Sequence, residues 1–170
     1  NDAAEAELIA SRAMLPLALT RLVSVCDNNV RRNYDHGDLL TTNPQATELH
    51  ELDPQSIAIL REAIKSASPA NRERLAHVIR AYQVAFARSP SGPVPPARPS
   101  MTHVYMDHDR HVNAINWASV QAIAEKAFPY SRARAATIPS AAGGDVINAV
   151  KHAGLDFSIF PNLGLICDVR

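Results

Sequence analysis

The sequence predicts an α+β protein, in which a helical N-terminal half packs on a small mixed α/β sheet formed by the C-terminal half. Three observations support this fold class. Apolar residues recur at helical spacing through residues 3–88. Five prolines interrupt residues 89–100, and shorter, alternating apolar segments follow them. We therefore expect a helical region at 1–88, a proline-rich linker at 89–100 and an α/β region at 101–170, together forming one compact unit.

The composition limits the class of protein. A chain of 170 residues with 46% hydrophobic residues is large enough to bury a core. Its 17 basic and 17 acidic side chains cancel, and only 5% of the residues are aromatic, which together argue against nucleic-acid binding. No stretch approaches about 20 uninterrupted apolar residues. We therefore expect no membrane span or signal peptide, and a soluble protein that is either cytoplasmic or secreted.

The N-terminal half contains three helical patterns. The first covers residues 3–32, where Pro16 is expected to kink the helix or to begin a second one. The pair Asp53-Pro54 has the residue types of an N-cap and a first helical position. The pair Ser68-Pro69 repeats this signal before a third apolar stripe. We expect that stripe to consist of Leu75, Val78, Ile79, Tyr82 and Phe86.

The C-terminal half is expected to contain strands and helices in the order β-α-β-α-β-β. The predicted strands are residues 101–106, 135–138, 157–160 and 163–169. The predicted helices are residues 112–128 and 141–153, the second with Gly154 as its C-cap. This order is typical of a small sheet covered by helices.

The densest cluster of titratable side chains lies at the junction of a predicted strand and a predicted helix. It contains Asp107, His108 and His111. Imidazole beside carboxylate can transfer protons near neutral pH, so these residues are candidate catalytic groups, with a histidine as general base and Asp107 orienting it. The same residues also fit a solvated helix start, in which an aspartate caps backbone amides. The spacing does not match the zinc peptidases, so we assign no metal site, and the sequence identifies no cofactor.

A second candidate site lies between the strand at 135–138 and the helix that follows it. Ser140, Gly143 and Gly144 are candidate anion-binding residues, because exposed backbone amides at a helix start can hold a phosphate or carboxylate. The established nucleotide-binding glycine patterns are missing, and Asp145 would repel an anion. An ordinary loop that caps a helix explains the same residues.

The two cysteines, Cys26 and Cys167, lie near opposite ends of the sequence. A disulfide between them would close a loop of roughly 140 residues and stabilise the fold by about 4 to 5 kcal/mol in an oxidising compartment. A buried free thiol in the first helix is the alternative. The sequence leaves this choice open.

Two hypotheses about function follow from these patterns. The first is a soluble protein-interaction or regulatory module, in which a groove near the linker meets a protein partner. The second is a small hydrolase or transferase that uses the His/Asp cluster at the start of the C-terminal half. The absence of a strong catalytic motif favours the interaction module.

Overall fold

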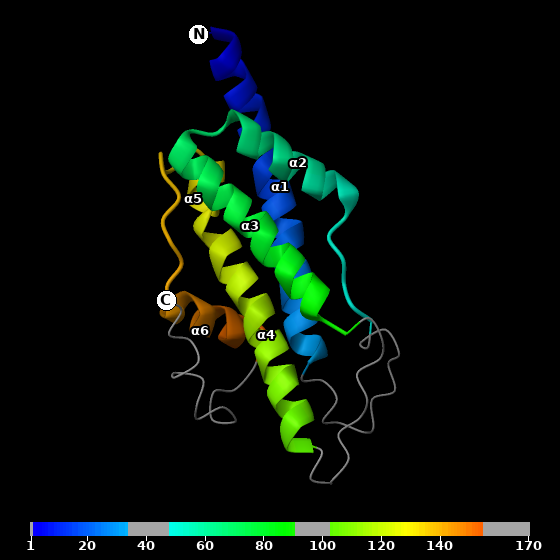
Figure 1. Ribbon diagram of the computed structural model, residues 1–170. Coiled ribbons are helices and arrows are strands. Elements are labelled where there is room, and N and C mark those ends of the chain that lie inside the picture. Colours follow the sequence, from blue (N-terminus) through cyan, green and yellow to red (C-terminus); the bar gives the residue numbers. More distant parts are fainter. Residues whose placement is uncertain (1, 34–47, 91–102, 155–170) are drawn as a thin grey trace.

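The computed structural model describes residues 2–33, 48–90 and 103–154, and for Ala4 and residues 103–111 it describes the backbone alone (Figure 1). Every regular element in this part of the chain is a helix. The helices are α1 (Asp2–Arg32), α2 (Pro54–Ser66), α3 (Pro69–Arg88), α4 (His103–Lys126), α5 (Phe128–Ser131) and α6 (Gly143–His152).

The helices form a bundle around α1 and α4. Helix α1 packs against both α2 and α4, and α3 packs against the same two helices. Helix α6 lies across α4, and the short α5 returns the chain toward α1 (Figure 1). Helices from both halves of the chain therefore share one apolar core.

The core forms where the apolar face of α1 meets that of α4. The buried residues of α1 recur at spacings of three and four, which places them on one side of the helix. Trp117 of α4 is fully buried, and its ring meets that of Tyr82 of α3 edge to face at 5.9 Å. Its indole N–H donates to the hydroxyl of Ser89 at 2.8 Å. These aromatic residues therefore serve packing, and Tyr82 does so as part of the apolar stripe that the sequence predicted.

Helix α1 continues through Pro16 without a break. The proline removes one backbone donor, and the hydroxyl of Thr20 donates to the Pro16 carbonyl at 2.8 Å. Pro16 therefore does not begin a second helix, because α1 is one helix of 31 residues. Within it, residues Glu5–Arg32 have the length and composition that a membrane span requires. The mostly buried core helix of a soluble protein and a signal sequence near an N-terminus pass the same test. In this chain 28% of the apolar window of α1 is buried, and the buried face forms part of the core.

The predicted start of α2 is confirmed. The Asp53 carboxylate accepts hydrogen bonds from the Ser56 amide at 2.9 Å and from its hydroxyl at 2.6 Å. These bonds and the nearby Arg21 guanidinium lower the pKa of Asp53. Helix α3 begins at Pro69 as expected, although Ser68 makes no side-chain capping bond. Proline in the first turn suits both helices because the missing N–H has no partner there.

The predicted α+β fold is wrong: 79% of the described residues are helical and none is in a strand. Residues 103–106, expected to end a strand, form the first turn of α4, which starts nine residues before the predicted helix. Residues 135–138 are not a strand either, because no neighbouring strand is present in the described part to accept their backbone bonds. The strands predicted at 157–160 and 163–169, and most of the linker, lie outside the described residues.

A side chain takes the place of a neighbouring strand at residues 135–138. Buried Asn71 of α3 donates to the Ala136 carbonyl at 2.8 Å and accepts from the Ile138 amide at 2.9 Å. Asn29 of α1 does the same for His50, with bonds of 2.9 and 2.8 Å to its carbonyl and amide. Each asparagine side chain therefore bonds to one backbone carbonyl and one backbone N–H of an extended segment. We call this arrangement an amide clamp.

Helix α6 ends at His152 with Ala153 as its C-cap, one residue earlier than the sequence predicted, and Gly154 follows the cap. Gly154 adopts a positive φ of 80°, a conformation that side chains with a Cβ atom rarely take. The helix covers ten of the thirteen residues expected, and its buried residues Val146, Ala149 and Val150 face α4 and the core.

Candidate functional site

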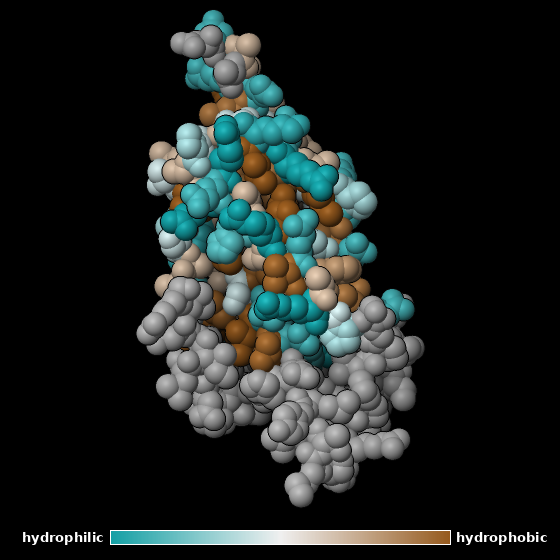
Figure 2. All heavy atoms as spheres, in the orientation of Figure 1, coloured by the Kyte–Doolittle hydropathy of each residue, from teal (hydrophilic) through white to brown (hydrophobic). Residues whose placement is uncertain are grey.

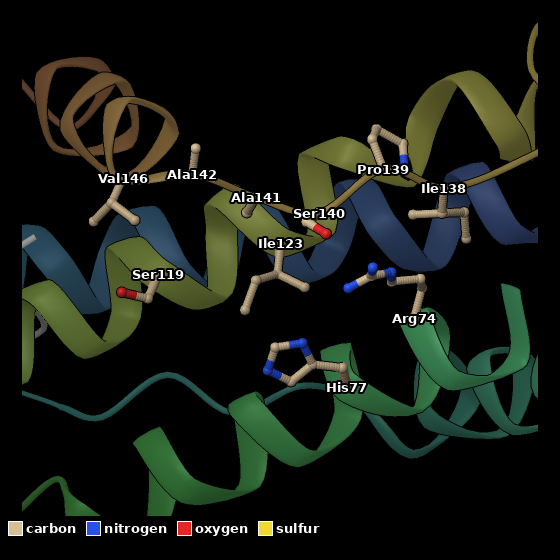
Figure 3. Close-up of a pocket in the computed structure, with 10 residues that line it drawn as sticks. All are labelled: Arg74, His77, Ser119, Ile123, Ile138, Pro139, Ser140, Ala141, Ala142 and Val146. Atoms are coloured by element: carbon tan, nitrogen blue, oxygen red, sulfur yellow. The ribbon is translucent and has the colours of Figure 1, made fainter. Parts of the chain in front are cut away.

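A pocket of about 190 Å³ opens between α3, α4 and the segment that leads into α6 (Figure 3). Its apolar lining comes from Ile123 of α4, from Val146 of α6, and from Ile138, Pro139, Ala141 and Ala142 of the connecting segment. Hydrophilic residues cover much of the molecular face over α3, and hydrophobic atoms are visible between them (Figure 2). The pocket is therefore an apolar hollow beside a polar surface.

Two cationic or ionisable side chains of α3 stand at the edge of this pocket. Arg74 and His77 lie three residues apart, so both project from one face of the helix. Figure 3 shows both side chains extending toward Ile123 on the opposite wall. Neither forms a hydrogen bond or ion pair with any residue that the structure describes. Within the described part of the chain, their polar groups therefore lie unpaired beside an apolar wall.

The connecting segment owes its position to interactions at both of its ends. At its start, the amide clamp of Asn71 holds Ala136 and Ile138 against α3. At its end, the Asp145 carboxylate accepts from the Ala142 amide at 2.8 Å and pairs with Lys126 of α4 at 2.7 Å. These bonds fix the third wall of the pocket relative to α3 and α4.

The three candidate anion-binding residues lie in two different parts of the structure. Ser140 lines the pocket opposite α3, whereas Gly143 and Gly144 are the first two residues of α6. There the protein's own carboxylate, on Asp145, already accepts the amide hydrogen of Ala142. A Cβ atom added to Gly144 would meet no atom within 4 Å, so no close approach requires glycine at that position. Anion binding by these three residues stays a prediction.

Acidification should weaken the attachment of α6 through Asp145. The hydrogen bond from Lys126, followed by that from Ala142, lowers the pKa of Asp145 in the folded state. A carboxyl whose pKa is lowered by folding stabilises the protein above its unfolded pKa of about 3.9, and this stabilisation is lost as the pH falls through the folded pKa. We expect Asp145→Asn to lower the unfolding free energy by about 0.5–1 kcal/mol at pH 7. At pH 3 the difference should shrink.

Urea unfolding of both proteins at pH 7 and pH 3 measures this effect. Glu73→Gln is the control, because Glu73 is exposed and has no partner among the described residues. An Asp145→Asn penalty that is the same at both pH values would contradict the assignment of the effect to the carboxylate charge.

The candidate catalytic residues Asp107, His108 and His111 belong to the first turns of α4. Their side chains lie outside what the structure describes, so their proposed role stays a prediction. Asp107 and His111 are four residues apart on a helix, which places their Cα atoms one turn apart. Among the described residues, no group of three or more His, Cys, Asp or Glu side chains is arranged to hold a metal ion.

Cys26 is fully buried in α1 and forms no disulfide with any described residue. Burial raises the pKa of its thiol, and the neighbouring carboxylates of Asp27 and Glu125 raise it further. A thiol in this environment is a poor nucleophile. Cys167, its expected disulfide partner, lies outside the described residues.

Sequence reasoning missed Arg74 and His77. Both are exposed residues of α3 on the side that borders α4, and exposed charged residues beside a buried stripe usually contact solvent alone. They line a pocket only because the segment around Ser140, more than sixty residues later in the chain, forms another of its walls. A periodic pattern within one helix contains no information about which distant segment covers it.

Comparison of the chain with protein-family models, with curated proteins and with solved structures finds no match to any of them. The function is therefore argued from the geometry of the chain itself.

Proposed function

We infer that the protein is a regulatory binding module whose ligand is a small apolar molecule with one anionic group. The observation that carries this proposal is the pair Arg74 and His77, which have no described partner and extend into an apolar pocket. An anionic group would bind the guanidinium, which can donate two parallel hydrogen bonds to a carboxylate. The apolar body would contact Ile123 and Val146 on the other walls.

The volume of the pocket limits the ligand. A cavity of about 150 Å³ lined by apolar side chains holds benzene, and this pocket measures about 190 Å³. A single ring with a carboxylate therefore has a suitable size. Drug-sized molecules need larger pockets, of about 300 Å³ or more.

The ligand would contact three separate elements of the fold, and this supports a regulatory role. Arg74 belongs to α3, Ile123 to α4, and Ser140 to the segment that enters α6. A ligand in contact with all three would favour the arrangement in which α6 packs on α4, and would stabilise the folded state in proportion to its occupancy. The protein partner predicted from the sequence remains compatible with such a module.

Benzoate is a direct probe of this site. From its nine non-hydrogen atoms we expect a dissociation constant of about 0.1–1 mM, measured by calorimetry or by chemical-shift changes of Ile123 and Ala141. Arg74→Ala should weaken binding by about tenfold or more, because the carboxylate loses its charged donor. Benzamide, which has the same shape without the charge, should bind the original protein about as weakly as benzoate binds the variant.

Arg80→Ala is the matched control. Arg80 lies on the same helix, is exposed, and does not line the pocket, so its removal should change benzoate affinity by less than about twofold. The proposal is wrong if benzoate does not bind at about 10 mM, or if Arg74→Ala and Arg80→Ala have equal effects.

A further inference from the structure

The first half of α1 presents an apolar face that no described residue covers. Helix α1 extends beyond the neighbouring ends of α2 and α3 at its N-terminus (Figure 1). Of the four large hydrophobic side chains that are exposed in the described part of the chain, three lie here: Ile9 at 63%, Met14 at 45% and Leu17 at 41%. Ala6, Ala10 and Ala13 are exposed beside them.

This face carries no charge along about three helical turns. Arg12 is the only charged residue between Leu8 and Thr20. It points toward α5, where its guanidinium donates to the Tyr130 carbonyl at 3.2 Å and lies 4.2 Å from the centre of the Tyr130 ring. A helical end with few tertiary contacts is marginally stable in water, so a partner that covers this face would stabilise it.

Charges lie symmetrically at the two ends of the apolar face. Glu7 and Arg21 are fourteen residues apart, about four helical turns, and therefore lie on the same side of α1. Met14 is midway between them. If two copies of α1 pack antiparallel about Met14, Glu7 of each copy lies beside Arg21 of the other. A parallel arrangement would instead place like charges together.

Both charged side chains are accessible for this pairing. Glu7 is exposed, and Arg21 retains 41% of its side-chain exposure while one nitrogen of its guanidinium donates to Asp53 at 3.2 Å and to Gln55 at 3.3 Å. The pairing requires no displacement of these bonds, because a guanidinium has five donors and both bonds come from the same nitrogen.

We propose that the exposed face of α1, defined by Ala6, Ile9, Ala10, Ala13, Met14 and Leu17, binds the same face of a second copy of this chain in an antiparallel arrangement. The alanines permit close approach of the two helices, and the larger side chains fill the space beside them. A single pair of helices buries less than about 1,200 Å² in total, which is typical of weak or transient complexes. We therefore expect a dimer with a micromolar dissociation constant.

Sedimentation equilibrium of the whole chain over a range of concentrations tests the proposal. We expect the mass to rise from that of one chain to twice that value. Ala13→Glu should raise the dissociation constant by at least about tenfold, because it brings two carboxylates together near the symmetry axis. Val84→Glu is the matched control: Val84 is 47% exposed on α3, and its replacement should change the constant by less than about twofold.

Oxidative cross-linking tests the antiparallel register. In a Cys167→Ser background, Ala13→Cys should form a disulfide between copies, because the two thiols lie close to the axis. Ala6→Cys should not, because the corresponding thiols would be about 24 Å apart along the helix axis. Native Cys26 is fully buried and would not compete.

Three outcomes would overturn the proposal. The first is a single-chain mass at every concentration. The second is equal cross-linking of the Ala6→Cys and Ala13→Cys variants, which would indicate a parallel pair or random collision. The third is a monomer that co-sediments with phosphatidylcholine vesicles and loses this binding in Ala13→Glu, which would assign the face to a lipid surface.

Discussion

Replacing Trp117 with alanine should lower the free energy of unfolding by about 3–5 kcal/mol. The ring is fully buried between α3 and α4, where it contacts Tyr82 edge to face and donates to the Ser89 hydroxyl. The variant would lose the transfer energy of the largest side chain in the core and leave a cavity that the helices can only partly fill. For a chain of this size the melting temperature should fall by roughly 10 °C.

Circular dichroism is the suitable measurement, because Trp117 is the only tryptophan and its fluorescence disappears in the variant. Val84→Ala provides the comparison: it also truncates a large apolar side chain on the bundle, but at an exposed position, and should cost about 0.5 kcal/mol or less. Equal losses of unfolding free energy in the two variants would contradict the assignment of Trp117 as a buried contact between α4 and α3.

Replacing Asn71 with alanine should lower the free energy of unfolding by about 2–3 kcal/mol. This amide clamp is the described partner of the Ile138 amide and the Ala136 carbonyl, and Ile138 is itself buried. Without the side chain, these backbone groups lose their bonds and the segment that forms the third wall of the pocket loses its attachment to α3. Benzoate affinity should therefore fall together with stability.

Asn148→Ala separates this effect from a general effect of removing asparagine. Asn148 is exposed on α6, and alanine is the better helix former, so its replacement should leave stability unchanged or raise it slightly. Urea unfolding and benzoate titration of both variants complete the comparison. An Asn71→Ala protein that keeps full stability and full affinity would show that the amide clamp does not hold the segment.

The helices could be predicted because their information is local. The Asp53-Pro54 and Ser68-Pro69 pairs mark the starts of α2 and α3, and Gly154 marks the end of α6. Each signal depends on residues within one or two turns of the helix end. Local chemistry of this kind is visible in a sequence without knowledge of what packs nearby.

The expected strand at residues 135–138 was wrong because an extended backbone is compatible with more than one partner. A short apolar segment can pair with another strand or bond to a buried side chain, and the local residues do not distinguish the two cases. Here the partner is Asn71, more than sixty residues earlier. Residues 103–106 form the first turn of α4 instead of a strand. A few residues in which apolar and polar side chains alternate weakly do not distinguish a strand from the start of a longer helix.

The sequence by itself determined where α2 and α3 begin, which glycine follows α6, the balance of charge, and the apolar stripe of α3 that includes buried Leu75, Val78 and Tyr82. Only the tertiary structure decided that Arg74 and His77 share a pocket with Ser140, and that none of the described residues covers one face of α1. The physical reason is the range of the interactions. Capping and helical periodicity act over a few residues, whereas a pocket exists only after distant segments have been brought together by packing and by long-range bonds such as those of Asn71.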